Sequence, residues 1–354
     1  PASRNHVLAT AAMAVVLALP APALAKAGDK PSEPTDKPVK RKKARQPAPL
    51  RDGDAERRLL EISQLTAQGR AREALPLAER LVRDHPNFQL AQLALGDLLA
   101  ARARPVARVG DVALQPAVTM AVPASIPGLQ FATAATAPMT PAPGNTSALP
   151  QTASETLANL RSELRLRIDS TKAPPPQGSI PAQFLELPAR TRHAIAMDAS
   201  RSRLYLFEHT DKGLVLVADY YASVGKLGTE KAVEGDQRTP LGVYFITSRL
   251  DSAVLKDFYG AGALPINYPN PLDQSRGKTG SGIWLHGTPP DQFSRAPLAT
   301  DGCLALANPD LQRILQTVEP RTTPVVIARQ LQWVKPHALQ AERQSFHAVL
   351  DAWR

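Results

Sequence analysis

Cysteine is almost absent from this sequence, because its 354 residues contain only Cys303. A single thiol excludes a disulfide within the chain, and it excludes the cysteine clusters of structural zinc sites. The seven histidines are scattered without the spacing of a metal site, and no glycine-rich phosphate loop is present. We therefore expect no metal ion and no cofactor, and any chemistry of the thiol has to come from the residues around it.

The start of the sequence has features of an export signal, although exported proteins usually pair their cysteines. Arg4 and His6 precede an apolar run over residues 7–19, and Ala23-Leu24-Ala25 offers the small residues of a cleavage site. The run is too short to favour a membrane span, so we predict a signal peptide over residues 1–25. Export would place the protein in the periplasm of a Gram-negative bacterium, with membrane contact only if the signal stays uncleaved.

Positive charge is concentrated in the first half of the chain. The net charge is +10, yet from Ile180 onward 19 lysines and arginines face 17 aspartates and glutamates. The densest basic cluster, residues 40–45, lies in a proline- and alanine-rich stretch over residues 26–54. We interpret this stretch as a tether that is solvated or attracted to anionic lipid or wall polymer, and we expect no nucleic-acid partner.

Three amphipathic runs predict a small helical module over residues 55–104. Apolar residues recur with helical spacing in each run, and Gly69 and the segment His85-Pro86-Asn87 separate the runs. The pattern resembles a tetratricopeptide repeat, but only about one and a half units are present, whereas a stable array usually needs at least three. We therefore predict a helical hairpin module, which is also the candidate site for a protein partner.

The middle of the chain predicts a linker followed by a β-rich domain. Residues 105–154 are rich in alanine, proline and threonine, and residues 155–179 hold a short amphipathic helix and a run of three prolines. From residue 180 to residue 332, short β-branched and aromatic runs alternate with turn signals. We predict a mainly-β sandwich or barrel with few helices there, including one helix over residues 309–318 that Asn308 caps.

The last segment, residues 333–354, predicts an amphipathic helix. Its apolar face consists of Leu339, Phe346, Val349, Leu350 and Trp353. Two interpretations stay open. Either this face packs back on the β domain, or the helix opens a further α+β domain, similar to nuclear transport factor two, of which the sequence holds only the start.

One segment carries the residue types of a thiol enzyme. His286 closes a predicted strand and is followed by Gly287, and Cys303 comes seventeen positions later, directly after Gly302. Thiols attack as thiolates, so an imidazole that removes the proton is the usual activator. A glycine lets the backbone bend before the nucleophile, and the amides of Gly302 and Cys303 are candidate oxyanion donors. We predict Cys303 as the nucleophile and His286 as its base.

This segment resembles the L,D-transpeptidase catalytic domain, often called the YkuD domain. The family pattern is His-Gly, a spacer, and then Gly-Cys with an asparagine and an aspartate nearby. The matching residues are His286, Gly287, Gly302, Cys303, Leu304, Leu306, Asn308 and Asp310. Upstream, Thr239-Pro240-Leu241-Gly242 resembles a second motif of the family. The resemblance covers roughly residues 193–329 and implies that the backbone carbonyl of Gly287 orients the histidine ring.

The sequence departs from the family pattern beside the cysteine. Thr300 stands for the usual serine, Asp301 for a residue that is often histidine, and Ala305 for the usual arginine. Arg295 or Arg276 would then supply the missing cation. The Asp-Gly-Cys variant looks like the YafK-type branch, which includes members that hydrolyse rather than transfer. The residues that we expect to contact substrate are Thr300, Arg295, Tyr268 and Trp284.

The resemblance implies a peptidoglycan stem peptide as the partner of the site. Cys303 would attack a tetrapeptide stem, release D-alanine and form a thioester. Transfer of the acyl group to an amine would form a cross-link or attach a protein, and we therefore predict an L,D-transpeptidase. Two alternatives stay open. One is an amidase or peptidase of the same fold that hydrolyses links between wall and protein, and the other is a wall-binding adaptor without catalysis.

Overall fold

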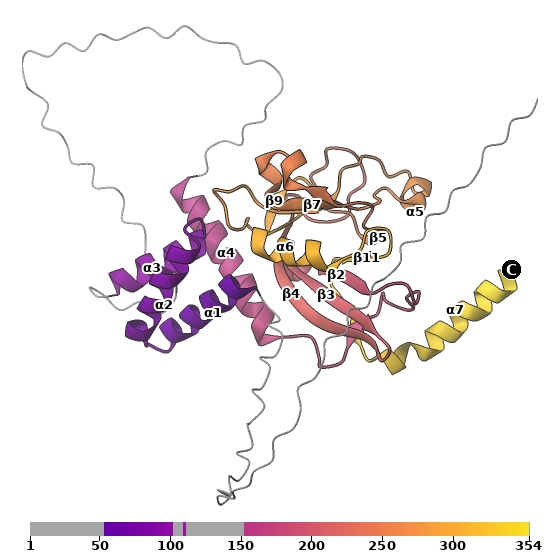
Figure 1. Cartoon of the computed structure of the whole chain (residues 1–354), viewed down its shortest axis with the longest axis horizontal. Coiled ribbons are helices and arrows are strands. Elements are labelled where there is room, and N and C mark those ends of the chain that lie inside the picture. The colour runs from indigo at the N-terminus through magenta and orange to yellow at the C-terminus, as the bar shows by residue number, and fades with distance from the viewer. Residues whose placement is uncertain (1–52, 102–108, 111–151, 354) are drawn as a thin grey trace, which may run out of the picture. The chain divides into compact units, whose positions relative to one another are not determined.

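The computed structural model of the chain describes residues 53–101, 109–110 and 152–353 (Figure 1). The predicted signal peptide, nearly all of the predicted basic tether and most of the predicted linker lie outside the described residues. Within these ranges no helix is long and apolar enough to cross a membrane. The described residues comprise a helical part before residue 173 and a mainly-β part after it.

Four helices form the N-terminal part, which we call the helical module. They are α1 (Asp54–Ala67), α2 (Ala71–Asp84), α3 (Gln89–Ala100) and α4 (Ala153–Lys172). The first three occupy the ranges of the three amphipathic runs, and Gly69 adopts a positive φ of 73° between α1 and α2, which favours glycine. A capping box between Thr152 and Glu155 starts α4. Because Leu160, Leu164 and Ile168 of α4 pack into the core of the other three helices, this helix belongs to the module rather than to a connector.

In the described part of the chain, ten strands form one mixed sheet in the order β5-β11-β2-β3-β4-β10-β8-β7-β6, with β9 paired to β4 (Figure 1). The strands are β2 (His193–Asp198), β3 (Arg203–Thr210), β4 (Gly213–Gly225), β5 (Gly242–Phe245), β6 (Leu250–Asp251), β7 (Gly262–Pro265), β8 (Trp284–His286), β9 (Leu298–Thr300), β10 (Leu304–Leu306) and β11 (Pro324–Ala328). Two short strands, β1 (Ile180–Pro181) and β12 (Trp333–Val334), pair separately. The predicted mainly-β class is confirmed.

The main core lies between this sheet and helix α6 (Asn308–Thr317). Leu311 and Ile314 of α6 are fully buried among apolar side chains of the central strands. A short helix, α5 (Pro271–Ser275), lies in the connection between β7 and β8. Helix α6 begins one residue before the predicted range, and the predicted cap is wrong, because Ala307 occupies the N-cap position and the side chain of Asn308 bonds elsewhere.

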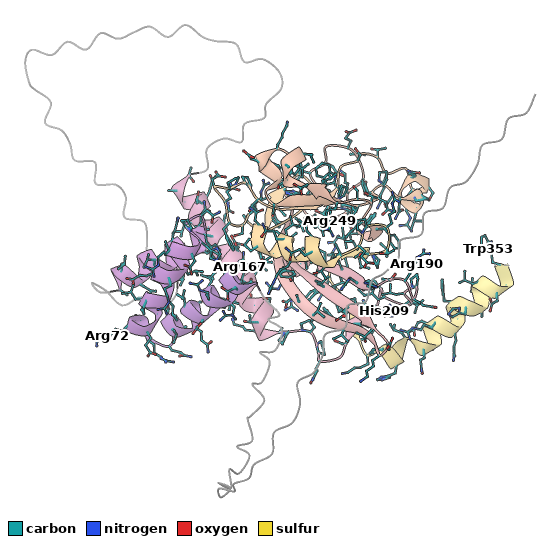
Figure 2. All side chains as sticks on the ribbon, in the orientation of Figure 1. Arg72, Arg167, Arg190, His209, Arg249 and Trp353 are labelled. Carbon is teal, nitrogen blue, oxygen red and sulfur yellow. The ribbon has the colours of Figure 1, made fainter. Side chains whose placement is uncertain are left out.

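A network of buried charges joins the helical module to the sheet. Arg167, labelled on α4 in Figure 2, is one member of this network. It bonds to Glu56 of α1 over 2.8 Å and to Glu163 over 2.7 Å. Arg203 of β3 bonds to the same Glu56 over 2.8 Å and to Asp219 of β4 over 2.6 Å. Arg167, Glu56 and Arg203 are each at most 2 % exposed, so the module and the sheet share a dehydrated interface.

Helix α7 (Gln340–Trp353) follows β12 and contacts the β domain near its start. The Arg343 side chain donates to the Leu185 carbonyl, and His347 lies 2.6 Å from Glu186. Leu339, just before the helix, is 5 % exposed, whereas Trp353 at its end is 85 % exposed (Figure 2). The predicted apolar face is therefore covered only at its beginning.

Candidate active site

Strands β8 and β10 bring His286 and Cys303 to the same face of the sheet. The two strands pair in parallel, with Leu304 opposite Leu285 and Ala305 opposite His286. Extending this register by one residue places Cys303 opposite Trp284. The Trp284 backbone hydrogen-bonds the Cys303 sulfur. Side chains alternate between faces along a strand, and residues opposite each other share a face. The imidazole and the thiol are therefore diagonal neighbours on one face.

The His286 ring is held in one orientation and one tautomer. Its Nδ1 lies 2.6 Å from the Gly287 carbonyl oxygen, which can only accept, so Nδ1 carries the proton and Nε2 is left as an acceptor. The ring packs between Phe258 and Tyr259, with centroids 5.9 Å and 5.3 Å away. Burial lowers the pKa of His286 to about 4, the Gly287 bond opposes this shift and the charge of Arg295 adds to it. The imidazole is therefore neutral at neutral pH.

Asn308 fixes the backbone on which the histidine depends. Its Oδ1 accepts from the amides of Ala261 over 2.8 Å and Thr288 over 3.2 Å, and its Nδ2 donates to the Thr288 carbonyl over 2.8 Å. A Cβ at Gly287 would collide with the same Oδ1, so this position has room only for glycine. Asn308 is recognisable in the sequence as a motif residue, but its spacing does not reveal this bridge.

A tight turn before β10 presents Cys303. Gly302 has a φ of 125°, and a Cβ there would lie 2.7 Å from the Arg238 carbonyl oxygen, so only glycine fits. Thr300 Oγ1 donates to the Cys303 carbonyl over 2.7 Å and accepts from the Gly302 amide over 3.1 Å. Thr239 Oγ1, from the predicted second motif, donates to the Gly302 carbonyl over 2.9 Å. Thr300 thus supports the turn from a position that is 2 % exposed.

These bonds correct one expectation about the oxyanion donors. The Gly302 amide already donates to Thr300 Oγ1, so it is engaged in this arrangement and is not directed at a substrate. Of the two predicted donors, the Cys303 amide is the one that remains.

The thiol of Cys303 is half-buried and protonated at rest. Burial raises its pKa, while the Trp284 backbone bond and the positive charge of Arg295 oppose that shift. The sulfur lies 3.4 Å from the Gly282 carbonyl oxygen, to which the S–H donates. Asp301 turns away to Lys226, 2.9 Å distant, and is exposed, so it is not a third member beside the imidazole. The resting site is a neutral thiol beside a neutral base.

Arg295 supplies a positive charge next to both groups. Its guanidinium lies over the Phe258 ring, 4.3 Å from the centroid, and its charge acts on Cys303 and on His286. Its Nε is buried without a hydrogen-bond partner among the described residues. Arg276, the other predicted cation, lies exposed at the end of α5. Of these two arginines, Arg295 is the one whose charge acts on Cys303 and His286.

Residues 192–327 match the sequence model of the YkuD L,D-transpeptidase catalytic domain. This part of the chain is a YkuD domain. In the YkuD domain described above, the matched residues include His286, Cys303 and Arg295.

Several solved structures resemble the chain over part of its length. Bd1075 of Bdellovibrio bacteriovorus is 29% identical, with 50% of this chain and 63% of that chain covered and a TM-score of 0.43. The helical cell shape determining protein Pgp2 of Campylobacter jejuni is 27% identical, with 47% and 57% covered and a TM-score of 0.39. An L,D-transpeptidase of Mycobacterium smegmatis is 15% identical, with 39% and 59% covered and a TM-score of 0.25. The chain thus spans less than two thirds of each of these proteins, and no curated protein matches it.

Two further residues that were expected to contact substrate differ in their surroundings. Trp284 is half-buried, with its ring 4.9 Å from that of Tyr259 beside the histidine. Tyr268 is 5 % exposed in the main core, where its hydroxyl donates to the Thr279 carbonyl over 3.1 Å. His209, on β3, binds the Thr191 carbonyl through Nδ1 over 2.9 Å. Within the described ranges, no three histidine, cysteine or acidic side chains gather as a metal site.

Proposed function

We propose that this chain is a cysteine acyltransferase that acts on tetrapeptide stems of peptidoglycan through a thioester on Cys303. The observation that carries the proposal is the shared face of His286 and Cys303, together with the bond from Nδ1 to Gly287 that leaves Nε2 free to accept a proton. The YkuD match supports the substrate class. Trp284 and Arg295, which border the thiol, are the substrate-facing residues of this proposal.

The thiol of Cys303 and the imidazole of His286, both neutral at rest and called the neutral pair below, determine the order of the proton transfers. When substrate binds, His286 Nε2 takes the proton of the thiol, and the sulfur attacks the carbonyl carbon at the L-centre of the third residue. The bond from that carbon to the nitrogen of D-alanine breaks, and the imidazolium returns its proton to the leaving amine. An acceptor amine then attacks the thioester, gives a proton to Nε2, and the carbon–sulfur bond breaks with the thiol restored.

The acceptor decides between the two enzyme classes that share this thioester. In an L,D-transpeptidase the acceptor is an amine of a second stem or of a protein, and in a peptidase it is water. We propose transfer to an amine as the reaction. Hydrolysis would keep the roles of Cys303 and His286 and would change only the second step.

Mass spectrometry of purified protein incubated with tetrapeptide muropeptides tests the proposal. We expect loss of D-alanine, a covalent acyl adduct on Cys303 and cross-linked dimers. Tripeptide monomers without dimers would contradict transfer, and the absence of both products with intact protein would favour the adaptor. The control is Cys303→Ala, which removes the nucleophile and should form neither adduct nor product.

We also propose that the enzyme acts in the periplasm, where its polymer substrate lies. Support comes from the basic and apolar pattern over residues 4–25 of the sequence. Fractionation of cells that express the tagged full chain tests this, with the tagged chain lacking residues 1–25 as the control. Recovery of the full chain with cytoplasmic markers would contradict the proposal.

A further inference from the structure

The segment between the two reacting groups reaches out of the YkuD domain into the helical module. We call residues 288–297 the connecting loop, because they join His286 at the end of β8 to the turn that carries Cys303. Phe293 in the middle of this loop is 6 % exposed and belongs to the core of the helical module rather than to that of the sheet. Its ring lies 4.2 Å from Phe88 and 5.1 Å from His85. The aromatic side chain of Phe293 thus anchors the connecting loop in the core of the helical module.

Hydrogen bonds fasten the same part of the loop to the module. The Phe293 amide donates to the Asn87 carbonyl over 3.1 Å, and Asn87 Nδ2 donates to the Pro290 carbonyl over 3.0 Å. Ser294 Oγ donates to Glu163 of α4 over 2.7 Å. Glu163 is the partner of Arg167 in the buried charge network, so the loop and the junction form one connected set of bonds.

The other side of the loop is fixed to the sheet. Tyr221 of β4 donates its hydroxyl to the Arg295 carbonyl over 2.8 Å, and Ser223 Oγ donates to the Ala296 carbonyl over 2.6 Å. Arg167 lies over the Tyr221 ring, 4.0 Å from its centroid. The backbone of Arg295 is therefore held between the module, two residues away at Phe293, and β4.

We propose that Arg295 forms a subsite for the terminal carboxylate of the stem peptide, and that Phe293, seated in the helical module, is its positioning residue. This inference rests on the proposed function for the identity of the substrate. The guanidinium has a buried Nε without a hydrogen-bond partner among the described residues, and it packs on Phe258, whose ring lies 5.9 Å from that of His286. A planar guanidinium with free donors matches the geometry of a carboxylate.

The dimensions of the substrate place its terminal carboxylate close to the thiol. One residue of an extended chain spans about 3.5 Å, so the terminal carboxylate of D-alanine lies only one residue from the carbonyl that Cys303 attacks. Arg295 is near enough for its charge to lower the pKa of the Cys303 thiol against the effect of burial. The helical module thereby becomes part of the binding site without contributing a side chain that touches substrate.

Alkylation of Cys303 by a charged and a neutral reagent tests the subsite without any peptidoglycan. Iodoacetate carries a carboxylate and iodoacetamide does not, so the ratio of their rate constants measures a cation beside the sulfur. We expect Arg295→Gln to lower this ratio by about tenfold or more, which is the effect of losing one charged hydrogen bond. Arg276→Gln is the matched control and should leave the ratio unchanged. An unchanged ratio in Arg295→Gln would overturn the subsite, whether or not the chain proves to be a transpeptidase.

Two variants test the positioning role of Phe293. Phe293→Ala empties part of the module core, and Asn87→Ala removes one loop bond without creating a large cavity. We expect both to lower the charge ratio in the direction of Arg295→Gln, and to add little when combined with it, because they act through the same residue. If these variants lose stability but keep the ratio of the two alkylation rate constants, Phe293 has only a structural role and its proposed positioning of Arg295 is wrong.

The same logic extends to substrate. A tetrapeptide muropeptide whose terminal carboxylate is amidated should have a KM about tenfold higher than the free acid with the wild-type protein. Arg295→Gln should raise the KM of the free acid and lose the preference. If neither peptide reacts while the alkylation ratio behaves as expected, the proposed function fails and the anion subsite stands.

Discussion

Two buried polar regions of this molecule respond to dehydration in opposite ways. At the junction of α1, α4 and β3, Glu56, Arg167 and Arg203 keep their charges, because each acid faces a guanidinium. Burial alone would raise the pKa of Glu56, but Arg203 and Arg167 outweigh it and hold that pKa below its usual value. At the candidate active site, His286 and Cys303 lose their charges, because burial dominates both. Partners, rather than burial itself, decide which groups remain ionised.

The neutral pair should be the more sensitive region to a single change in chemistry. His286→Gln keeps a polar side chain but removes the proton acceptor, so we expect D-alanine release at pH 7 to fall by at least about 1000-fold. The matched control is His209→Gln, on β3, where the imidazole only binds a backbone carbonyl (Figure 2). Retained activity in His286→Gln would contradict the assignment of His286 as the base.

The charged region should be the more sensitive to removing one partner. Arg167→Met leaves Glu56 and Glu163 buried without that guanidinium, which should cost about 3–5 kcal/mol in the free energy of unfolding. Urea denaturation followed by circular dichroism measures this. Arg72→Met, at an exposed position of α2, is the control and should change stability by less than about 0.5 kcal/mol (Figure 2). Equal effects of the two changes would mean that the network does not hold the junction.

Asp310 of α6 combines features of both regions. It is buried like the active-site pair, and it is close enough to the junction for the charges of Glu56 and Arg167 to act on it. Burial raises its pKa to about 7, the charge of Glu56 adds to the shift, and Arg167 opposes it. An acid whose pKa is higher in the folded state holds its proton more tightly there, so stability falls as pH rises from about 4 to about 7. We expect the wild type to lose about 3 kcal/mol of unfolding free energy over this range through Asp310.

Thermal unfolding of Asp310→Asn between pH 5 and pH 8 measures this contribution. The variant should unfold at a higher temperature than the wild type at pH 8 and near the same temperature at pH 5. Asp169→Asn, at a side chain of α4 that is 53% exposed, is the control. A wild type that is more stable than Asp310→Asn at pH 8 would show that the carboxylate is compensated.

The pH profile of catalysis gives the mildest test of the neutral pair. Because the pKa of His286 is about 4, kcat/KM should stay level down to about pH 5, halve near pH 4 and fall about tenfold for each pH unit below that. Stopped assays of D-alanine release across pH 3 to pH 8 would show this limb. A limb near pH 6.5, the ordinary value for histidine, would indicate a solvated imidazole instead.

The local parts of this structure could be predicted from sequence. The three helical runs before residue 101, the strand ending at His286 and the glycine before Cys303 all follow from periodicity and from turn residues. The expectation that the carbonyl of Gly287 faces the histidine came from the family resemblance, and the structure shows that contact. These features depend on residues within a few positions of one another.

The remaining features depend on contacts between distant parts of the chain. Glu56 and Arg203 look like ordinary surface charges in the sequence, and only the fold brings them together across 147 positions. Phe293 reads as a loop aromatic until the helical module is placed against it. Asn308 reads as a helix cap, because its spacing before Pro309 fits a cap as well as it fits the bridge to Thr288 and Ala261. Periodicity carries no information on such pairings.

The parallel pairing of β8 and β10 has one further consequence. Parallel neighbours cannot be closed by a tight hairpin, so the chain leaving His286 must travel back along the whole strand before it can enter the second one. Here the first part of that return path, residues 288–297, lies outside the strands, and β9 then pairs with β4 before the chain reaches β10. This return segment therefore also supplies the connecting loop, which the helical module binds through Phe293.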